Sequence, residues 1–381
     1  MVVEASGRVG GLCVTERRDA FAFDIGGHIP FVNDDTRVQW LKKLLGDDLL
    51  WVDRPVSCVI DGRITPGRYL DRRPDGAVEP TPEDGSAFGE LGSRFGGEFT
   101  NRAMRAYLEK IDGVPLERIP GPRAIKLLVE QAAPEGFWFP RHGIGQLMEA
   151  MAREIAAAGG EVLLETRATE IDVTDGRVQS VTLDDGRTVA TDALVASIPS
   201  ALAARMARPA APAEATRDVE MRAVCIVYLG IDRECVSDQP WVQVDDPAVP
   251  FSRAFEPRNW SRDLSPSGQT MLGLECYCSA ERKDPVWGLS DDELAKTCQA
   301  ALVERLGWLD PGDAVRLVQL VRLPRAYPAP DLDQWPAVIA PGQWLTTITG
   351  LHLAPGAAVI EAIEQGEKAA DEILATARLA A

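Results

Sequence analysis

The stretch that decides the fold is the first one, Met1 to Phe31, which reads MVVEASGRVGGLCVTERRDAFAFDIGGHIPF. Its short β-branched run Val2-Val3 ends in Glu4. This is typical of the second strand of a dinucleotide-binding unit, where the acid accepts hydrogen bonds from the ribose hydroxyls. Gly10 and Gly11 follow, and a residue without a Cβ lets the backbone pass close to a pyrophosphate. These features predict an α/β protein with a Rossmann-like domain.

The second half of this stretch predicts a strand that runs into a tight turn. Phe21, Phe23 and Ile25 alternate with polar or small residues and lead into Gly26-Gly27-His28. No GxGxxG motif precedes Glu4, although that loop normally lies roughly 20 residues upstream of the acid. The first strand of such a sheet is central, so we expect an upstream extension that supplies a strand and the phosphate loop.

The segments Glu4 to Gly11 and Phe23 to His28 together resemble a known superfamily. They are similar to the FAD-dependent amine oxidases, protoporphyrinogen oxidases and phytoene desaturases, in a branch near the UDP-galactopyranose mutase-like flavoproteins. The resemblance implies FAD as the cofactor. It also implies a glutathione-reductase-type FAD/NAD(P)-binding domain with an inserted α+β substrate domain.

Composition excludes several classes of partner. The chain has 381 residues and a net charge of −18, which argues against binding to nucleic acid or to anionic lipid. It contains no run of 18 apolar residues, so no transmembrane helix is expected. Seven irregularly spaced cysteines favour free thiols in a reducing cytoplasm. In a strand, Cys276 and Cys278 would face one side, but no second pair or nearby histidine completes a metal site.

The order of the elements predicts a discontinuous flavin domain that a substrate domain interrupts twice. A helix is expected at 36–45, and 161–198 reads as strands around hairpin turns at Asp175-Gly176 and Asp185-Gly186. Residues 344–350 read as a strand, and 357–375 as a helix. The flavin domain is assigned to residues 1–50, 140–205 and 335–381, and the substrate domain to residues 51–139 and 206–334.

The resemblance assigns the cofactor-binding residues. It implies that Glu4 binds the ribose, and that Arg8, Gly10 and Gly11 meet the pyrophosphate. The backbone of Ala168 would contact adenine. The remaining positions would lie near the flavin ring: Gly27, Gly350, Ala357, Ala358 and Val359.

Two residues are candidates for the chemistry. In mutase-like relatives a histidine in the same Gly-Gly-His loop lies against the flavin, so His28 is a candidate catalytic residue; a buried structural histidine is equally compatible with the sequence. Tyr327, in Arg325-Ala326-Tyr327-Pro328, is a second candidate that would line the cavity, although such tyrosines more often belong to the core. No two histidines have the spacing of metal ligands, so no metal is expected.

Three functions remain open at this stage. The leading one is an FAD-dependent oxidoreductase that oxidises a small organic substrate by hydride transfer to the flavin. The second is a sugar-nucleotide isomerase resembling UDP-galactopyranose mutase, and the third is a truncated, inactive family member. The mutase reaction needs arginines for a diphosphate and a fuller His loop, which favours the oxidoreductase.

Overall fold

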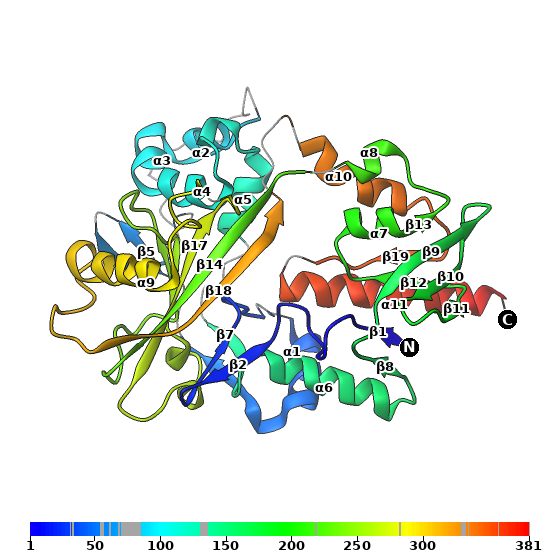
Figure 1. The fold of residues 1–381 in the computed structure, drawn as a ribbon, viewed down its shortest axis with the longest axis horizontal. Helices are drawn as coiled ribbons and strands as arrows, with labels where there is room; N and C mark the ends of the chain where they lie inside the picture. Colours follow the sequence, from blue (N-terminus) through cyan, green and yellow to red (C-terminus); the bar gives the residue numbers. More distant parts are fainter. Residues whose placement is uncertain are drawn as a thin grey trace. The chain divides into compact units, whose positions relative to one another are not determined.

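The computed structural model divides into two compact units, each built from distant parts of the chain (Figure 1). It describes residues 1–30, 32, 34–53, 57–60, 62–67, 69, 85–129, 136–217, 219–281, 283–328, 333, 335–356 and 358–380. Unit 1 comprises Met1–Val14, Leu147–Val219 and Gln334–Ala381, and unit 2 comprises Thr15–Gln146 and Glu220–Asp333. Residues 15–50, which we assigned to the flavin domain, therefore cluster with unit 2 by their contacts.

Unit 1 contains short parallel strand pairs, an antiparallel meander and helices. β1 pairs with β8 and β12 with β19, both in parallel, while β9, β10 and β11 form the meander. Ile171, Ala203, Ala204 and Leu345 belong to its core. Its elements are β1 (Val2–Val3), α6 (Ile144–Ala157) from Leu147 onward, β8 (Val162–Leu163), β9 (Ala168–Thr174), β10 (Arg177–Leu183), β11 (Thr188–Ala190), β12 (Leu194–Ala196), α7 (Ser200–Met206), β13 (Ala207–Arg208), α8 (Ala213–Thr216), α10 (Trp335–Leu345), β19 (Leu351–Leu353) and α11 (Val359–Ala380).

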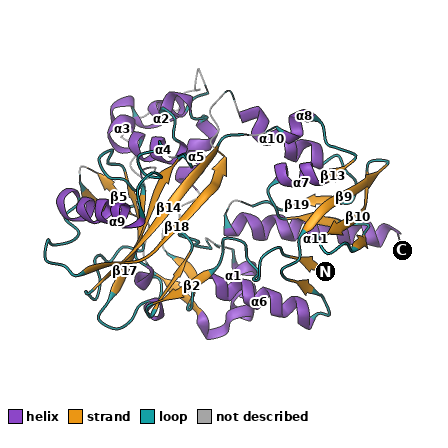
Figure 2. Cartoon of the chain, viewed as in Figure 1, coloured by secondary structure: helices purple, strands orange, loops and turns teal. Residues whose placement is uncertain are grey.

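Unit 2 is organised around a seven-stranded sheet of order β18-β14-β17-β16-β15-β5-β6 (Figure 2). Its pairings are antiparallel except that between β15 and β5. The sheet strands are β5 (Ser57–Ile60), β6 (Arg63–Pro66), β14 (Met221–Ile231), β15 (Trp241–Val244), β16 (Arg253–Phe255), β17 (Thr270–Cys278) and β18 (Val315–Pro328).

Short hairpins and helices complete unit 2. They are β2 (Thr15–Arg18), β3 (Phe21–Asp24), α1 (Asp35–Leu45), η1 (Gly46–Asp48), β4 (Leu49–Val52), α2 (Ala87–Phe95), α3 (Gly97–Ala103), α4 (Arg105–Asp112), η3 (Leu116–Arg118), α5 (Gly121–Val129), β7 (Phe137–Pro140), η4 (Pro257–Asn259), η5 (Arg262–Leu264), α9 (Asp291–Ala300) and the π-helical turn η6 (Ala301–Arg305).

Each face of the large sheet belongs to a separate core, because successive strand residues point to opposite sides. Val227, Leu274 and Cys276 face α9 and pack with its Leu294. The other face carries Tyr228, which packs in the core that includes residues of α2, α4 and α5. That second face also holds the polar side chains described below.

Two secondary-structure expectations need correction. The strand predicted at 344–350 is instead the end of α10 followed by a turn, and β19 starts only at Leu351. The hydroxyls of Thr346 and Thr347 donate to the carbonyls of Gln343 and Trp344 and close the helix end, so β-branched residues here do not extend a strand. The sequence of residues 89–108 also has a helical pattern, which predicts one helix there; the structure instead contains α2, α3 and α4, which are separated at Gly96, whose φ is 83°, and at Met104.

Candidate functional site

One face of the sheet in unit 2 carries a group of polar and aromatic side chains. They come from neighbouring strands, on which every second residue points to this face. Glu275 and Tyr277 lie on β17, Arg253 on β16 and Trp241 on β15, all in the interior of the unit. Arg253 and Glu275 are direct cross-strand partners. Charged residues are rarely buried this deeply unless they are paired, so the face is a built polar site within an apolar core.

Arg253 is the centre of this arrangement. Its Nη1 lies 3.3 Å from Glu275 Oε2 and donates to the Tyr277 hydroxyl at 2.7 Å, while Nε donates to the Tyr107 hydroxyl at 3.0 Å. The guanidinium also lies 5.5–5.9 Å from the centroids of the Tyr107, Trp241 and Tyr277 rings. Such a multiply bonded pair has a fixed geometry, and removing one partner would leave an uncompensated buried charge.

The turn Gly26-Gly27-His28 is bonded to this face. The Gly26 N–H donates to the Tyr228 hydroxyl at 2.9 Å, and the Gly27 N–H donates to Glu275 Oε1 at 3.2 Å. A Cβ on Gly27 would lie 1.7 Å from Trp241 Cζ3, so only glycine fits there. The sequence predicted Gly27 as a cofactor contact; the described packing accounts for its missing side chain through Trp241.

His28 lies in the same turn and is half-buried. Burial lowers the pKa of His28 below its usual 6.5, and the nearby Glu275 charge only partly opposes this shift. Its Nδ1 is buried and has no hydrogen-bond partner among the described residues. A neutral imidazole with one unused nitrogen can donate or accept one hydrogen bond, according to its tautomer.

Tyr327 lies near the end of β18 and belongs to the same cluster. Its ring centroid lies 5.8 Å from that of Tyr277, and burial raises the pKa of Tyr327 above 10, with the Glu275 charge acting in the same direction. Its phenol is therefore a neutral group at physiological pH. The two residues predicted for chemistry, His28 and Tyr327, thus lie in one unit and both interact electrostatically with Glu275.

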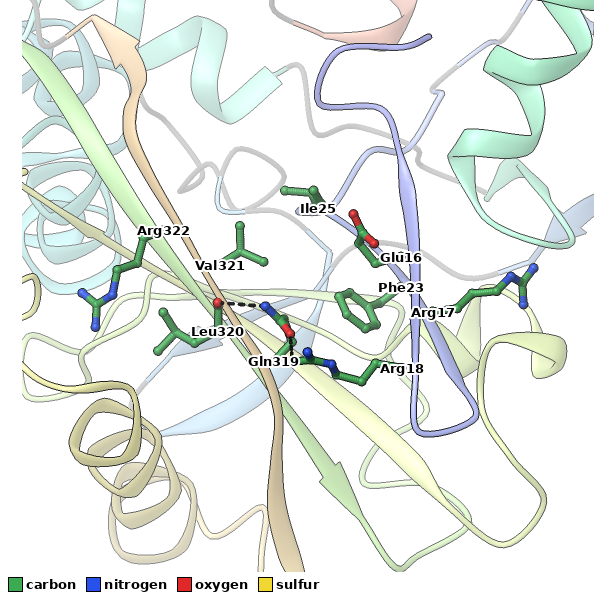
Figure 3. Close-up of a pocket in the computed structure, with 9 residues that line it drawn as sticks. All are labelled: Glu16, Arg17, Arg18, Phe23, Ile25, Gln319, Leu320, Val321 and Arg322. Atoms are coloured by element: carbon green, nitrogen blue, oxygen red, sulfur yellow. Dashed lines mark hydrogen bonds between the residues drawn. The ribbon is translucent and has the colours of Figure 1, made fainter. Parts of the chain in front are cut away.

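A pocket of about 500 Å³ opens beside the strand that leads into the glycine turn (Figure 3). Figure 3 shows Val321 and Phe23 on opposite sides of it, with Gln319 below them and next to Arg18. The Arg18 guanidinium bonds to Gln319. Its lining residues are Glu16, Arg17, Arg18, Phe23, Ile25, Gln319, Leu320, Val321 and Arg322. The volume suits a small organic molecule.

In unit 1, Glu4 follows β1 directly and is held by the backbone around it. Its N–H donates to the Leu163 carbonyl at 2.8 Å, its carbonyl accepts from Thr166 at 3.0 Å, and its Oε1 accepts from the Ser6 N–H at 2.7 Å. Ala168 opens β9 shortly after Thr166. A half-buried carboxylate at a parallel strand end suits a ribose diol.

Gly10 and Gly11 adopt successive positive φ values of 104° and 60°. A Cβ on Gly10 would lie 2.6 Å from Met148 Cγ, whereas a Cβ on Gly11 would meet nothing within 4 Å. Gly10 thus packs closely on α6, and Gly11 leaves room beside the backbone for a ligand. Arg8 lies exposed two residues earlier. This segment fits an approaching pyrophosphate.

The C-terminal candidates lie around β19 and the start of α11. Gly350 has φ 80°, its carbonyl accepts from Leu194 at 2.7 Å, and a Cβ would lie 2.4 Å from the Asp192 carbonyl oxygen. Ala358 precedes α11, and Val359 is its first residue. Helix N–H groups at such an end favour an anion. Ala357 lies outside the described residues.

The sequence alone did not identify Glu275 and Arg253, the charged pair on the buried face of the sheet. All nine residues of β17 are buried, and Glu275 is its only charged residue. A lone acid in a continuous apolar strand was the available signal, since burying such a group requires a partner. No signal of this kind marks Arg253, because its partner becomes a neighbour only when the sheet forms.

The chain belongs to the family of flavin containing amine oxidoreductases, which matches residues 71–374. This membership confirms FAD as the cofactor, and the chemistry of the carboxylate, glycine turn and helix end in unit 1 fits it.

The fold of this chain is similar to that of solved flavoprotein structures. Reduced UDP-galactopyranose mutase has a TM-score of 0.78 at 18% identity, over 98% of this chain and 90% of that chain. Wild-type putrescine oxidase with bound putrescine has a TM-score of 0.66 at 17% identity, over 98% and 93%. These likenesses confirm the Rossmann-like fold class.

Similarity to curated proteins is local. The phytoene desaturase (lycopene-forming) of Pantoea ananas is 37% identical over 62 residues, which are 16% of this chain and only 13% of that protein. Within the described residues, no helix is long and apolar enough to cross a bilayer. The same part of the chain contains no group of three or more His, Cys, Asp or Glu arranged to hold a metal.

Proposed function

We propose that this chain is an FAD-dependent oxidoreductase that oxidises a small organic substrate by hydride transfer to the flavin. The observation that carries the proposal is the neutral His28 with its unused, buried Nδ1, in a glycine turn bonded to a buried polar sheet face. A bound flavin supplies the hydride acceptor, while the protein supplies position, dryness and charge. We also propose a cytoplasmic location, in keeping with seven free cysteines.

We assign cofactor binding to unit 1 and substrate binding to unit 2. In unit 1, Glu4 would hold the ribose, and the backbone of Ala168 would meet adenine. Arg8, Gly10 and Gly11 would hold the pyrophosphate. Positions beside the flavin ring would be Gly350, Ala357, Ala358 and Val359.

In unit 2, two groups would act on the substrate or the cofactor edge. His28 offers one hydrogen bond through its buried Nδ1, and Tyr327 offers a neutral phenol. Glu275 and Arg253 fix the Gly27 turn and the neighbouring Tyr277 ring, so they act through positioning. A hydride transfer needs no nucleophile. These four side chains are acids, bases and hydrogen-bond donors, which suits such a reaction.

The alternative, a mutase acting on a sugar nucleotide, would need cations for a diphosphate. Two buried arginines on this side of unit 2 are found among the described residues, and both are already engaged. Arg253 bonds to Glu275, Tyr277 and Tyr107, and Arg222 donates to the carbonyls of Lys110 and Ile111. These two side chains are therefore committed within the core, which supports the oxidoreductase; a mutase would have to bind the diphosphate through Arg17 and Arg18, which line the pocket.

The test is anaerobic mixing of the purified flavoprotein with amines, alcohols and unsaturated hydrocarbons, followed by flavin absorbance. At least one class should bleach the oxidised flavin without added reductant. His28→Asn should slow bleaching on the order of 10²-fold, as expected for a lost acid–base group. The exposed His142 provides the matched control, His142→Asn, which should leave the rate unchanged.

Two results would overturn the proposal. If no substrate bleaches the flavin, but chemically reduced protein interconverts the ring forms of a UDP-sugar, the chain is a mutase. If the purified chain binds no flavin even when FAD is added, it is an inactive family member.

A further inference from the structure

Four buried cysteines of unit 2 lie on the sheet face that packs against α9, outside the polar site described above. Cys225 is on β14, Cys276 and Cys278 are on β17, and Cys298 is on α9. They form two sulfur pairs: Cys225 and Cys278 Sγ lie 3.9 Å apart, and Cys276 and Cys298 Sγ lie 3.7 Å apart. The proposed reaction uses none of them.

A cation distinguishes the two pairs. Arg322 Nη1 lies 3.6 Å from Cys225 Sγ, and this guanidinium is held in place by the carbonyls of Trp287 and Leu289 and by Asp291. A positive charge beside sulfur favours the thiolate, which is the form that reacts with oxidants. Among the described residues, Cys276 and Cys298 have no hydrogen bond to a Lys or Arg; the Lys110 charge acts on Cys276 from a distance, while its ammonium group donates to the carbonyls of Val244 and Phe251.

The pKa values of the thiols also differ between the two pairs. A hydrogen bond from Cys278 and the Arg322 charge hold the pKa of Cys225 below its usual 9.0, against the effect of burial. The hydrogen bond to Cys225 and burial raise the pKa of Cys278. Cys276, whose neighbour is Cys298, likewise has a raised pKa. Cys225 is therefore the thiol that ionises first, and Cys278 is the proton-bearing partner beside it.

A small oxidant has a short route to Cys225. Cys225 and Cys278 are 0% and 1% exposed, and the Arg322 side chain, which contacts the Cys225 sulfur, keeps 25% of its surface exposed, so a shift of this one side chain would open a path to the sulfur. Cys278 is the last residue of β17, so the strand ladder continues on one side of it only. A strand end can shift more easily than a strand interior, which a closing disulfide would require.

We propose that Cys225 and Cys278 are a peroxide-reactive dithiol, in which Cys225 is oxidised first and Cys278 resolves it to an intramolecular disulfide. In the first step the Cys225 thiolate attacks one oxygen of hydrogen peroxide. The O–O bond breaks, Cys225 becomes a sulfenic acid, and the released hydroxide takes a proton to form water.

In the second step Cys278 loses its proton and its sulfur attacks the Cys225 sulfur. The S–O bond breaks, and the hydroxyl group leaves as water with that proton. Two thiols have then lost two electrons and two protons, and one peroxide has become two waters. The sulfurs move from 3.9 Å apart to a bonded distance of about 2.05 Å.

The test treats the full chain, with its cofactor bound, with a small excess of hydrogen peroxide. Remaining thiols are then alkylated under denaturing conditions, and peptides are mapped by mass spectrometry without reduction. A linked Cys225–Cys278 peptide should appear, while Cys276 and Cys298 remain alkylated. In Cys278→Ser, dimedone should label Cys225 as a sulfenic acid; Cys276→Ser, the matched control, should form the Cys225–Cys278 link normally.

Arg322→Gln should slow the formation of the link about tenfold, the change that one pKa unit makes in the thiolate fraction. Circular dichroism checks that this variant is folded, and Cys278→Ser provides an independent reading if it is not. The proposal is overturned if Cys276 and Cys298 link as fast as Cys225 and Cys278. It is also overturned if only the exposed Cys235 is oxidised, or if dimedone fails to label Cys225 in Cys278→Ser.

Discussion

Asp24 provides the sharpest test of the electrostatics of unit 2, because a neutral residue of the same shape should remove the dependence of stability on pH that this carboxyl group causes. The residue ends β3 and is 1% exposed. Its Oδ1 accepts from Thr15 Oγ1 at 2.6 Å, and its two oxygens accept from the Ile144 N–H at 3.0 and 3.1 Å, where α6 begins. Burial raises the pKa of Asp24 from 3.8 to about 7, although these hydrogen bonds act in the opposite direction.

The direction of the effect follows from proton binding. Between pH 3.8 and about 7, the folded chain keeps the Asp24 proton while the unfolded chain loses it. The free energy of unfolding therefore falls as pH rises through this window, by about 1.4 kcal/mol per pH unit. The penalty is absent below pH 3.8 and reaches its full size, ~4 kcal/mol, above about pH 7.

Asp24→Asn removes this penalty because the amide does not ionise. We expect the stability of the variant relative to the native chain to increase by about 1.4 kcal/mol per pH unit from pH 5 to 7. The amide N–H₂ facing the Ile144 N–H adds a cost that does not depend on pH. The informative quantity is thus the slope of the difference and not its absolute value.

Urea unfolding at several pH values, followed by tryptophan fluorescence, measures that slope. Seven of the nine tryptophans belong to unit 2, which also contains Asp24. Asp47→Asn, at an exposed position of the same unit, is the matched control and should run parallel to the native chain. Parallel curves for Asp24→Asn, or a difference that shrinks as pH rises, would show that Asp24 is ionised in the folded chain and refute the reasoning.

Three further substitutions test separate parts of the structure. Gly27→Ala places a Cβ 1.7 Å from the Trp241 ring, so thermal unfolding should show a loss of at least ~3 kcal/mol. Glu4→Ala should weaken FAD binding by ~1.5–3 kcal/mol in a flavin titration and leave the unfolding of unit 2 unchanged; equal affinity would remove Glu4 from the ribose site. Ser290→Ala removes a capping box shared with Glu293 and should cost ~1 kcal/mol, whereas Ser290→Thr should cost little by the same urea assay.

The features that the sequence determined are those whose cause is local. The sequence predicts a helix that follows Ser290, and Ser290 is the N-cap of α9, because its hydroxyl and the Glu293 carboxylate three residues later satisfy each other's backbone N–H groups. Gly46 ends α1 at a positive φ of 55°, at the end predicted for the helix at 36–45, and the Asp34 side chain accepts from the Arg37 N–H at its start. Val2-Val3 forms a strand ahead of Glu4, and the meander β9–β11 turns at the expected Asp-Gly pairs. Such signals lie within a few residues of one another and need no distant partner.

The limit of local signals is visible at 344–350. Its apolar and β-branched residues are compatible with a strand or with the last turn of a helix, and periodicity alone does not separate the two over so few residues. The helical conformation is favoured here because Leu345, at the end of α10, is buried in the core of unit 1. The hydroxyls of Thr346 and Thr347 then bond to carbonyls of the last helical turn.

Only the tertiary structure assembled the polar site. Arg253 and Glu275 become neighbours because β16 and β17 pair in one register, and a slip of one residue would turn Glu275 into the opposite core. The Gly27 N–H reaches Glu275 across 248 residues of sequence. Burial then sets the protonation of His28 and Asp24, since a pKa shift depends on the surrounding medium and charges, which the amino-acid sequence does not display until the chain has folded.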